Sequence, residues 1–273
     1  MDLHTIRTVL RPSAVEQVAG WTPGHAWLAG GTWLFSEPQV STDTLVDLHG
    51  LGWPALEADA TGLTIAATCR IAEIAHYAGP ADWRAVPLFR QCCDSFLASF
   101  KIWNAATVGG NLVMSLPAGP MTALAAALDG VCVVWPRVGA PRMVPVVDFV
   151  TGDHTNVLQP GELLRSVHLP AAALRARTAM RHMALTKLGR SAALLVGTRN
   201  EQDAMVLTIT GSTDRPVQLR FPGVPDADGL RQAMATIPEA RWFQDVHGSA
   251  PYKRHVTQYF AEDIRAELGG LGA

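Results

Sequence analysis

The chain has 273 residues, of which 48% are hydrophobic, and this is enough for two or three packed domains. Its 22 basic and 24 acidic side chains leave a formal net charge of −2, which excludes the basic surface that nucleic acid or an anionic membrane would need. We therefore expect small molecules and proteins as partners.

Cysteine spacing and hydropathy narrow the class of protein further. The four cysteines, Cys69, Cys92, Cys93 and Cys132, lack the Cys-x-x-Cys spacing of zinc or iron–sulfur sites, so we expect reduced, buried thiols and no metal. No apolar run approaches the ~18 residues of a membrane span, and the N-terminal residues do not resemble a secretion signal. The sequence predicts a soluble, cytoplasmic protein without a membrane contact.

The N-terminal residues alternate short predicted elements with glycine-containing turns. Ser13 and Glu16 have the spacing of a helix capping box and predict a short helix through Ala19. Trp27 and Leu28 predict a brief strand that runs into Gly30 and Gly31. Further strands are predicted over 44–47 and 62–67, with a lobe boundary at Gly50, Gly52 and Pro54.

The remaining residues predict a mixture of helices and strands. Apolar spacing indicates helices over 71–77, 87–97 and 121–128 and strands over 131–135 and 162–169. An alanine-rich connector over 171–176 then leads to strands near 181–186 and 205–210 and to two terminal helices, the last over about 252–268.

Two glycine pairs carry the strongest functional signal. The first lies in Leu28, Ala29, Gly30, Gly31, Thr32 and the second in Ala106, Thr107, Val108, Gly109, Gly110, Asn111. Glycine allows positive φ and the close approach of an anion to main-chain N–H groups, while Thr and Asn side chains can bond phosphate oxygens. Together the two loops predict one cradle for the diphosphate of a dinucleotide.

The spacing of these glycines narrows the choice of dinucleotide. The chain has no Gly-x-Gly-x-x-Gly between a strand and a helix and no Gly-x-x-x-x-Gly-Lys-Ser/Thr, so neither a Rossmann unit nor a P-loop is indicated. A dinucleotide held by other glycine loops suggests a flavin. We find no Ser/His/Asp or paired-carboxylate pattern, and we assign no catalytic residue.

Several segments, in order along the chain, resemble one family. Residues 29–34 and 102–111 resemble the paired flavin loops of the FAD-binding medium subunits of molybdenum hydroxylases, which include the flavoproteins of xanthine dehydrogenase and carbon monoxide dehydrogenase. Residues 117–119, 160–164 and 245–254 are also similar to segments of that family. The resemblance covers nearly the whole chain.

The resemblance implies an α+β fold with a two-lobed FAD-binding domain of the PCMH type. Its N-terminal lobe would span 1–54 and its central lobe 55–172, and a C-terminal domain over 176–273 would hold a three-stranded sheet and helices. FAD would lie extended between the first two lobes.

The resemblance also implies the residues that contact FAD. Two groups would wrap the diphosphate and ribityl chain: Trp27, Leu28, Ala29, Gly30, Gly31, Thr32, Trp33 and Leu34, and Ala106, Thr107, Val108, Gly109, Gly110 and Asn111. Leu164 would pack near the adenine and Lys187 would contact a polar part of the cofactor.

The function implied by the resemblance is electron transfer within a complex. A large partner subunit would hold molybdopterin, and a small partner subunit would hold [2Fe–2S] clusters. FAD in this chain would take electrons from these clusters and pass them to NAD or another acceptor, so the chain would be active only in the complex.

Two residues depart from the family pattern and keep other functions open. Trp103 stands where the family usually has arginine, and Pro120 stands where it commonly has an acidic residue. Losing a charge-assisted hydrogen bond costs roughly 1.5 to 3 kcal/mol, so FAD could bind more weakly. The alternatives are a stand-alone FAD-dependent oxidoreductase of the same fold and a scaffold subunit without flavin.

Overall fold

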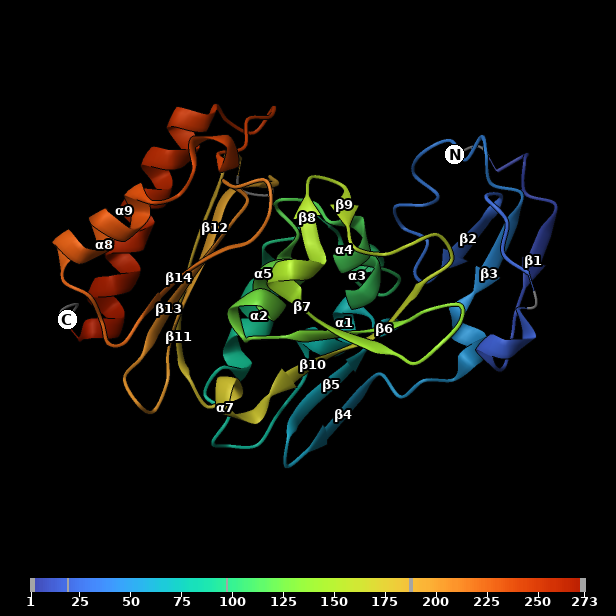
Figure 1. Cartoon of the computed structure of the whole chain (residues 1–273), viewed down its shortest axis with the longest axis horizontal. Helices are drawn as coiled ribbons and strands as arrows, with labels where there is room; N and C mark the ends of the chain where they lie inside the picture. The colour runs from blue at the N-terminus through green and yellow to red at the C-terminus, as the bar shows by residue number, and fades with distance from the viewer. Residues whose placement is uncertain (1–2, 19, 97, 187–188, 271–273) are drawn as a thin grey trace.

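Three sheets follow one another along the chain and along the long axis of the molecule (Figure 1). The computed structural model describes residues 3–18, 20–96, 98–186 and 189–270. Helices pack around the central sheet and cover one face of the C-terminal sheet (Figure 1). The predicted boundaries near residues 54 and 172–176 lie in the connections between sheets, and the division into domains stays a prediction.

The N-terminal sheet is small and parallel, in the order β1-β3-β2. Its strands are β1 (Thr8–Leu10), β2 (His25–Leu28) and β3 (Thr44–Asp47), and the last has the predicted bounds. The 3₁₀ helix η2 (Leu48–Leu51) then leads towards the central lobe.

The short helix predicted from Ser13 is not an α-helix. The structure has a three-residue 3₁₀ helix, η1 (Val15–Gln17), whose N-cap Ala14 has no capping side chain. Ser13 instead exchanges hydrogen bonds with Gln17, through its N–H and through its hydroxyl. The predicted end at Ala19 lies outside the described residues.

The central lobe is an antiparallel five-stranded sheet in the order β4-β5-β10-β6-β7. Its strands are β4 (Leu56–Asp59), β5 (Gly62–Ala66), β6 (Val131–Trp135), β7 (Arg142–Pro145) and β10 (Leu163–Pro170). The small hairpin of β8 (Val150–Gly152) and β9 (Thr155–Asn156) lies apart from this sheet.

Seven helices among the described residues belong to this lobe, and most are short. They are α1 (Ile71–Ala75), α2 (Val86–Asp94), α3 (Phe100–Trp103), α4 (Val108–Met114), α5 (Pro120–Ala127), α6 (Val146–Phe149) and α7 (Ala171–Leu174). Every residue of α5 is buried, because this helix packs against α2 and α4 and also against the C-terminal sheet. It therefore joins the two larger parts of the molecule.

The C-terminal part is an antiparallel sheet of four strands in sequence order, one more than the resemblance implies. Its strands are β11 (Arg177–Ala184), β12 (Ser191–Arg199), β13 (Met205–Thr210) and β14 (Val217–Phe221). The helices α8 (Ala227–Ala235) and α9 (Ala250–Gly269) pack together, with the 3₁₀ helix η3 (Glu239–Arg241) between them in sequence.

Strand β12 joins two hydrophobic cores because successive side chains of a strand point to opposite faces. Leu194 and Val196 belong to the core of the central lobe. Leu195 belongs to a second core, which the C-terminal sheet forms with α8 and α9. The C-terminal sheet is thus packed on both faces, and its position relative to the central lobe is set by buried contacts.

The thiols are buried and free, as the sequence predicts. Burial raises the pKa of Cys69, Cys93 and Cys132 to about 12 and also raises the pKa of Cys92. Among the described residues, no group of His, Cys, Asp and Glu could hold a metal ion, and no helix is long and apolar enough to cross a membrane. The cytoplasmic location stays a prediction.

Candidate functional site: a cofactor cavity between two lobes

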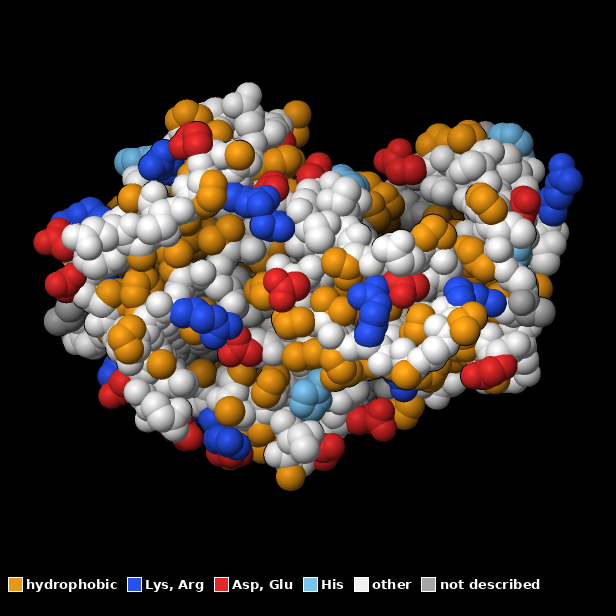
Figure 2. Space-filling model, in the orientation of Figure 1, with side chains coloured by type: hydrophobic (Ala, Val, Ile, Leu, Met, Phe, Trp, Pro, Cys, Tyr) orange, Lys and Arg blue, Asp and Glu red, His pale blue; other side chains and the backbone are white. Residues whose placement is uncertain are grey.

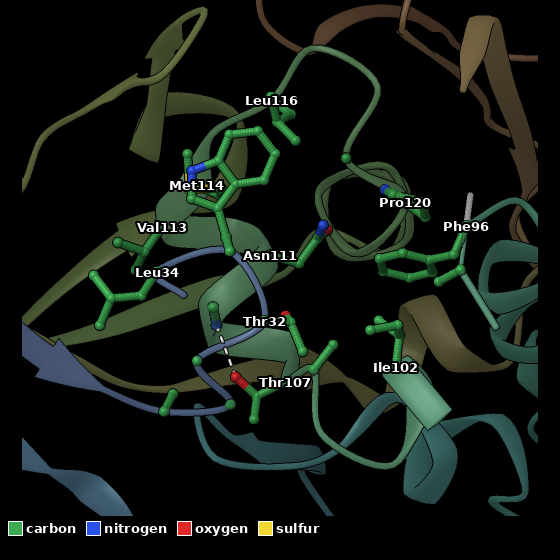
Figure 3. Close-up of a pocket in the computed structure, with 18 of the residues that line it drawn as sticks. Thr32, Leu34, Phe96, Ile102, Thr107, Asn111, Val113, Met114, Leu116 and Pro120 are labelled. Atoms are coloured by element: carbon green, nitrogen blue, oxygen red, sulfur yellow. Dashed lines mark hydrogen bonds between the residues drawn. The ribbon is translucent and has the colours of Figure 1, made fainter. Parts of the chain in front are cut away.

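A cavity of about 470 Å³ lies between the N-terminal and central lobes, within the usual size range of small-molecule sites. On the face shown in Figure 2, the surface is hollowed between these lobes, and acidic and basic side chains are interspersed. The cavity is lined by the loop after β2, the end of α2, the helices α3 and α4, and the turn before α5 (Figure 3).

The first glycine pair forms an irregular turn with main-chain donors to spare. Gly31 has a φ of +70°, which favours glycine, and its carbonyl accepts the N–H of Phe35. No hydrogen bond between described residues uses the N–H groups of Gly30, Gly31, Thr32 or Trp33. All four residues line the cavity, so this turn can bind an anion through its backbone.

Gly30 allows the two lobes to touch. A Cβ atom at this position would lie 2.0 Å from the carbonyl oxygen of Ala105, so only glycine fits against the chain that enters α4. Close by, Trp27 donates its indole N–H to the carbonyl of Glu162 at 3.1 Å. Glu162 is itself clamped by Arg142, which holds the pKa of that carboxyl below its usual value. These contacts fix the turn beside the start of β10, the middle strand of the central sheet.

The second glycine pair is not a loop but the first turn of α4. Thr107 is the N-cap, and its hydroxyl accepts the N–H of Gly110 at 3.1 Å (Figure 3). The N–H groups of Val108, Gly109 and Asn111 donate to the carbonyls of Cys69, Ala67 and Thr107. The predicted main-chain cradle therefore does not form here, because the protein itself satisfies these donors.

The glycines of α4 have different roles. A Cβ atom on Gly109 would lie 2.4 Å from the Cβ of Ala67, so this glycine lets the helix pack on the central sheet. Gly110 lines the cavity, and a Cβ there would meet only the Thr107 hydroxyl.

Side chains supply the polar groups of α4. Asn111 accepts the N–H of Met121 through Oδ1, and its Nδ2 has no hydrogen-bond partner among the described residues. Its side chain points into the cavity (Figure 3). Asn111 can therefore donate to a ligand while it fixes the start of α5.

Apolar side chains form much of the remaining wall. Phe96, Ile102 and Pro120 lie together on one side of the view in Figure 3, and Leu34 lies on the other. No His, Asp or Glu lines the cavity within the part of the chain that the structure describes. A flat, apolar ring can pack here, but the wall offers no acid or base.

Comparison with family models identifies this arrangement. Residues 5–172 match the family model described as the FAD binding domain in molybdopterin dehydrogenase. The chain belongs to this family. FAD is thus its cofactor, and the cavity fits FAD because free N–H donors lie on one side of it and an apolar wall on the other.

Solved structures share the whole fold of this FAD-binding chain. A chain of quinoline 2-oxidoreductase from Pseudomonas putida 86 matches with a TM-score of 0.78 and 19% identity, over 97% of each chain. A chain of carbon monoxide dehydrogenase from Oligotropha carboxidovorans matches with a TM-score of 0.78 and 21% identity, over 95% of this chain and 96% of the other. Carbon monoxide dehydrogenase from Hydrogenophaga pseudoflava matches with a TM-score of 0.77 and 16% identity, over 95% of this chain and 96% of the other. No curated protein matches the sequence.

The structure brings most of the predicted FAD-contact residues together. Twelve of the sixteen line the cavity: Trp27, Leu28, Ala29, Gly30, Gly31, Thr32, Trp33, Leu34, Ala106, Thr107, Gly110 and Asn111. Val108 and Gly109 are on the buried face of α4, and Leu164 lies in the core with 2% of its surface exposed. This placement does not support FAD contacts by these three side chains. Lys187 lies outside the described residues.

The two departures from the family pattern have different consequences. Trp103 does not line the cavity and instead packs against the core, with the Arg90 guanidinium 5.3 Å from its ring centre. Pro120 does line the cavity, as the first residue of α5, where a missing N–H costs nothing. Only the second departure changes the surface of the cavity.

Sequence analysis missed several residues of the wall, among them Phe96 and Arg190. Phe96 follows the end of α2 and reaches the cavity only because α2 packs beside α5. Arg190 comes from the C-terminal part of the chain, 79 positions beyond Asn111 (190 − 111). No local pattern in the sequence marks either residue as part of the cavity.

Proposed function

We propose that this chain is the FAD-binding electron-transfer subunit of a multi-subunit molybdenum hydroxylase. In this proposal it receives electrons from [2Fe–2S] clusters of a small partner subunit, and a large partner subunit oxidises the substrate at molybdopterin. NAD or another acceptor would take the electrons from FAD. Cytoplasmic location and activity only in the complex belong to the same proposal.

The observation that carries the proposal is the chemistry of the cavity. It offers main-chain donors at Gly30–Trp33 and an apolar wall at Phe96, Ile102 and Pro120. It offers no acid–base pair among the residues described. Bound FAD supplies the redox chemistry, since a flavin accepts a pair of electrons and can release them singly or together.

The residues of this chain would bind and orient FAD. The N–H groups of the Gly30–Trp33 turn would hold the diphosphate, and Asn111 would donate to FAD from its side-chain Nδ2. Thr107 would line the site while its hydroxyl caps α4. The apolar wall would pack on the isoalloxazine ring and exclude water from it. The first two lobes would form the FAD-binding domain, over 1–54 and 55–172, with the C-terminal domain over 176–273 closing one side.

The two alternatives are less well supported. A stand-alone oxidoreductase would need an acid or base for its own substrate, and the described wall has none. A scaffold subunit without flavin would have no use for free N–H groups that face a cavity. The resemblance of the fold to chains of quinoline 2-oxidoreductase and carbon monoxide dehydrogenase favours a subunit of such an assembly.

A paired substitution tests cofactor binding by the full chain. Gly110→Val places a branched side chain in the cavity and displaces the Thr107 hydroxyl. Gly223→Val is the matched control, because nothing lies within 4 Å of a Cβ at that position. Flavin released on denaturation is measured by absorbance at about 450 nm. We expect loss of FAD only in Gly110→Val, with both proteins still folded by circular dichroism.

A wild-type protein that takes up no FAD when the cofactor is added would overturn the proposal in favour of a scaffold subunit. The assembly is tested separately, by purifying the native complex through a tag on this chain and measuring molybdenum and iron. We expect both metals in the purified complex. Purification of this chain alone, with FAD and its own substrate turnover, would favour the stand-alone enzyme.

A further inference from the structure

Arg190 is the only charged side chain that lines the cavity within the described part of the chain. It is half-buried, and it has no ion pair or hydrogen-bond partner among the described residues. Most other arginines in the molecule do have a carboxylate or a carbonyl nearby, as Arg142 has in Glu162 and Arg181 has in Glu267. An unpaired cation that faces an apolar wall is therefore free to meet a ligand.

The position of Arg190 is set by the packing of the C-terminal sheet. Arg190 immediately precedes β12, whose residues up to Thr198 are all buried. Beside it, Gly211 donates its N–H to the carbonyl of Pro117 at 2.7 Å, which ties this sheet to the turn before α5. The fully buried Lys253 donates to the carbonyl of Gly211 at 3.2 Å and pairs with Asp245 at 2.8 Å. The strand that follows Arg190 is thus held in place beside the cavity.

The two ends of the cavity differ in chemistry. The glycine turn with its free N–H groups comes from the N-terminal lobe, and Arg190 comes from the C-terminal sheet. Figure 3 shows the blue chain of the N-terminal lobe and the brown strands of the C-terminal part on opposite sides of the cavity, with Phe96 and Pro120 nearer the brown side. With the diphosphate on the glycine turn and the flat ring on the apolar wall of Phe96 and Pro120, as proposed above, the ring would lie on the side of the cavity from which Arg190 comes.

We propose that Arg190 lies beside the pyrimidine edge of the isoalloxazine ring and stabilises the charge of the reduced flavin. This inference rests on the proposed function. Two electrons from a reductant and one proton from solvent convert the neutral oxidised ring into a reduced ring with one negative charge, spread over N1 and the C2 carbonyl oxygen. A guanidinium at this edge attracts the reduced form more strongly than the oxidised form, and so raises the reduction potential of the flavin.

The experiment measures affinity and potential on the full chain loaded with FAD. Arg190→Gln removes the charge, and Arg190→Lys keeps it. Arg177→Gln is the matched control, because Arg177 is exposed at the start of β11 and does not line the cavity. The Kd of oxidised FAD is measured by fluorescence, and the potential by titration against a dye of known potential with dithionite as reductant.

We expect Arg190→Gln to weaken binding of reduced FAD at least tenfold relative to oxidised FAD, which corresponds to a potential about 30 mV lower for a two-electron couple. The Kd of oxidised FAD should change less than threefold. The reduction potential of FAD in Arg190→Lys should stay close to the wild-type value, and in Arg177→Gln it should equal that value.

Other results contradict the inference in distinct ways. If Arg190→Gln raised the Kd of oxidised FAD tenfold and left the reduction potential unchanged, Arg190 would contact the diphosphate and not the ring. Unchanged affinity and unchanged potential in Arg190→Gln would show that this arginine is only solvated. A wild-type chain that binds no FAD at all would overturn the proposed function itself, and this assignment with it.

Discussion

The two glycine pairs look alike in sequence but differ in structure. Gly30 and Gly31 form a turn whose N–H groups have no acceptor among the described residues, and Gly31 has positive φ. Gly109 and Gly110 start a helix whose N–H groups are all bonded to oxygens of the protein. A glycine pair therefore does not form an anion site by itself. Its main-chain N–H groups stay free only where no oxygen of the protein accepts them.

The largest effect should come from filling the close contact at Gly30. In Gly30→Val the new side chain would overlap the carbonyl of Ala105, and overpacking against a backbone atom should cost about 3 kcal/mol, the upper end of the usual range. Because the contact sets the width of the cavity, we expect the Kd of FAD to rise roughly 150-fold. Equilibrium dialysis of FAD measures the change.

Gly109→Val supplies the comparison for that experiment. Its side chain would overlap Ala67 in the central sheet, so we expect a similar cost in the free energy of unfolding. Urea denaturation should therefore show similar losses for the two variants, and equilibrium dialysis should separate them, because Gly109 does not line the cavity and Gly109→Val should keep a nearly unchanged Kd for FAD. An equal rise in the Kd of FAD in both variants would remove the distinction between the pairs.

The next effect concerns the donor that α4 offers through a side chain. Asn111→Asp keeps an oxygen for the N–H of Met121 but replaces the free Nδ2 donor by an acceptor with negative charge. A lost hydrogen bond to a charged group costs about 1.5 to 3 kcal/mol, so we expect the Kd of FAD to rise by roughly 10- to 150-fold. The melting temperature should stay within a few degrees, and an unchanged Kd would show that Asn111 does not contact FAD.

A smaller, pH-dependent effect is expected where the first glycine turn is anchored. Arg142 lowers the pKa of Glu162, so the folded state binds a proton at this carboxyl less readily than the unfolded state. The stabilisation is fully present above pH 4.5, the ordinary value, and is lost as pH falls through the lowered value. Glu162→Gln should reduce the free energy of unfolding by about 1 to 2 kcal/mol at pH 7.

Urea denaturation at several pH values checks this prediction. The difference between wild type and Glu162→Gln should shrink as the pH is lowered below 4.5, because the wild-type carboxyl then becomes neutral as well. A difference that is constant from pH 7 to pH 3 would mean that the ion pair with Arg142 contributes nothing to stability.

The smallest effect should follow from removing the cap of the second pair. Thr107→Val deletes the hydroxyl that accepts the N–H of Gly110, and loss of an N-cap costs about 1 kcal/mol of stability. Since the structure gives Gly110 no donor role towards FAD, the Kd should change less than threefold. A clearly lower Kd would show that the freed N–H of Gly110 binds FAD. Both glycine pairs would then supply main-chain donors to the cofactor.

Local patterns in the sequence predict several elements well. The strands 44–47, 131–135 and 205–210 have the same bounds in the structure, and the last helix differs by two residues at its start and one at its end. These segments have clear apolar runs or a clear N-cap, such as Ser249, whose hydroxyl accepts the N–H of Tyr252. Such signals act within a few residues.

Other elements carry no local signal. Strand β12 is buried on both faces, which removes the alternation that marks a half-buried strand, and sequence analysis did not place it. The start of α4 was expected to be a loop, because two glycines are poor helix formers. Its N–H groups are instead satisfied by Cys69 and Ala67, which come from an earlier part of the chain and cannot be inferred from spacing.

The sequence alone determined the family, the flavin and twelve of the residues that line the cavity, because glycine pairs and their polar neighbours lie close together along the chain. Tertiary structure decided which glycine pair has free donors, where Leu164 lies, and that Arg190 reaches the cavity. The physical reason is that hydrogen-bond satisfaction and burial depend on groups brought together by folding, often from segments more than 30 residues apart, such as Gly109 and Ala67.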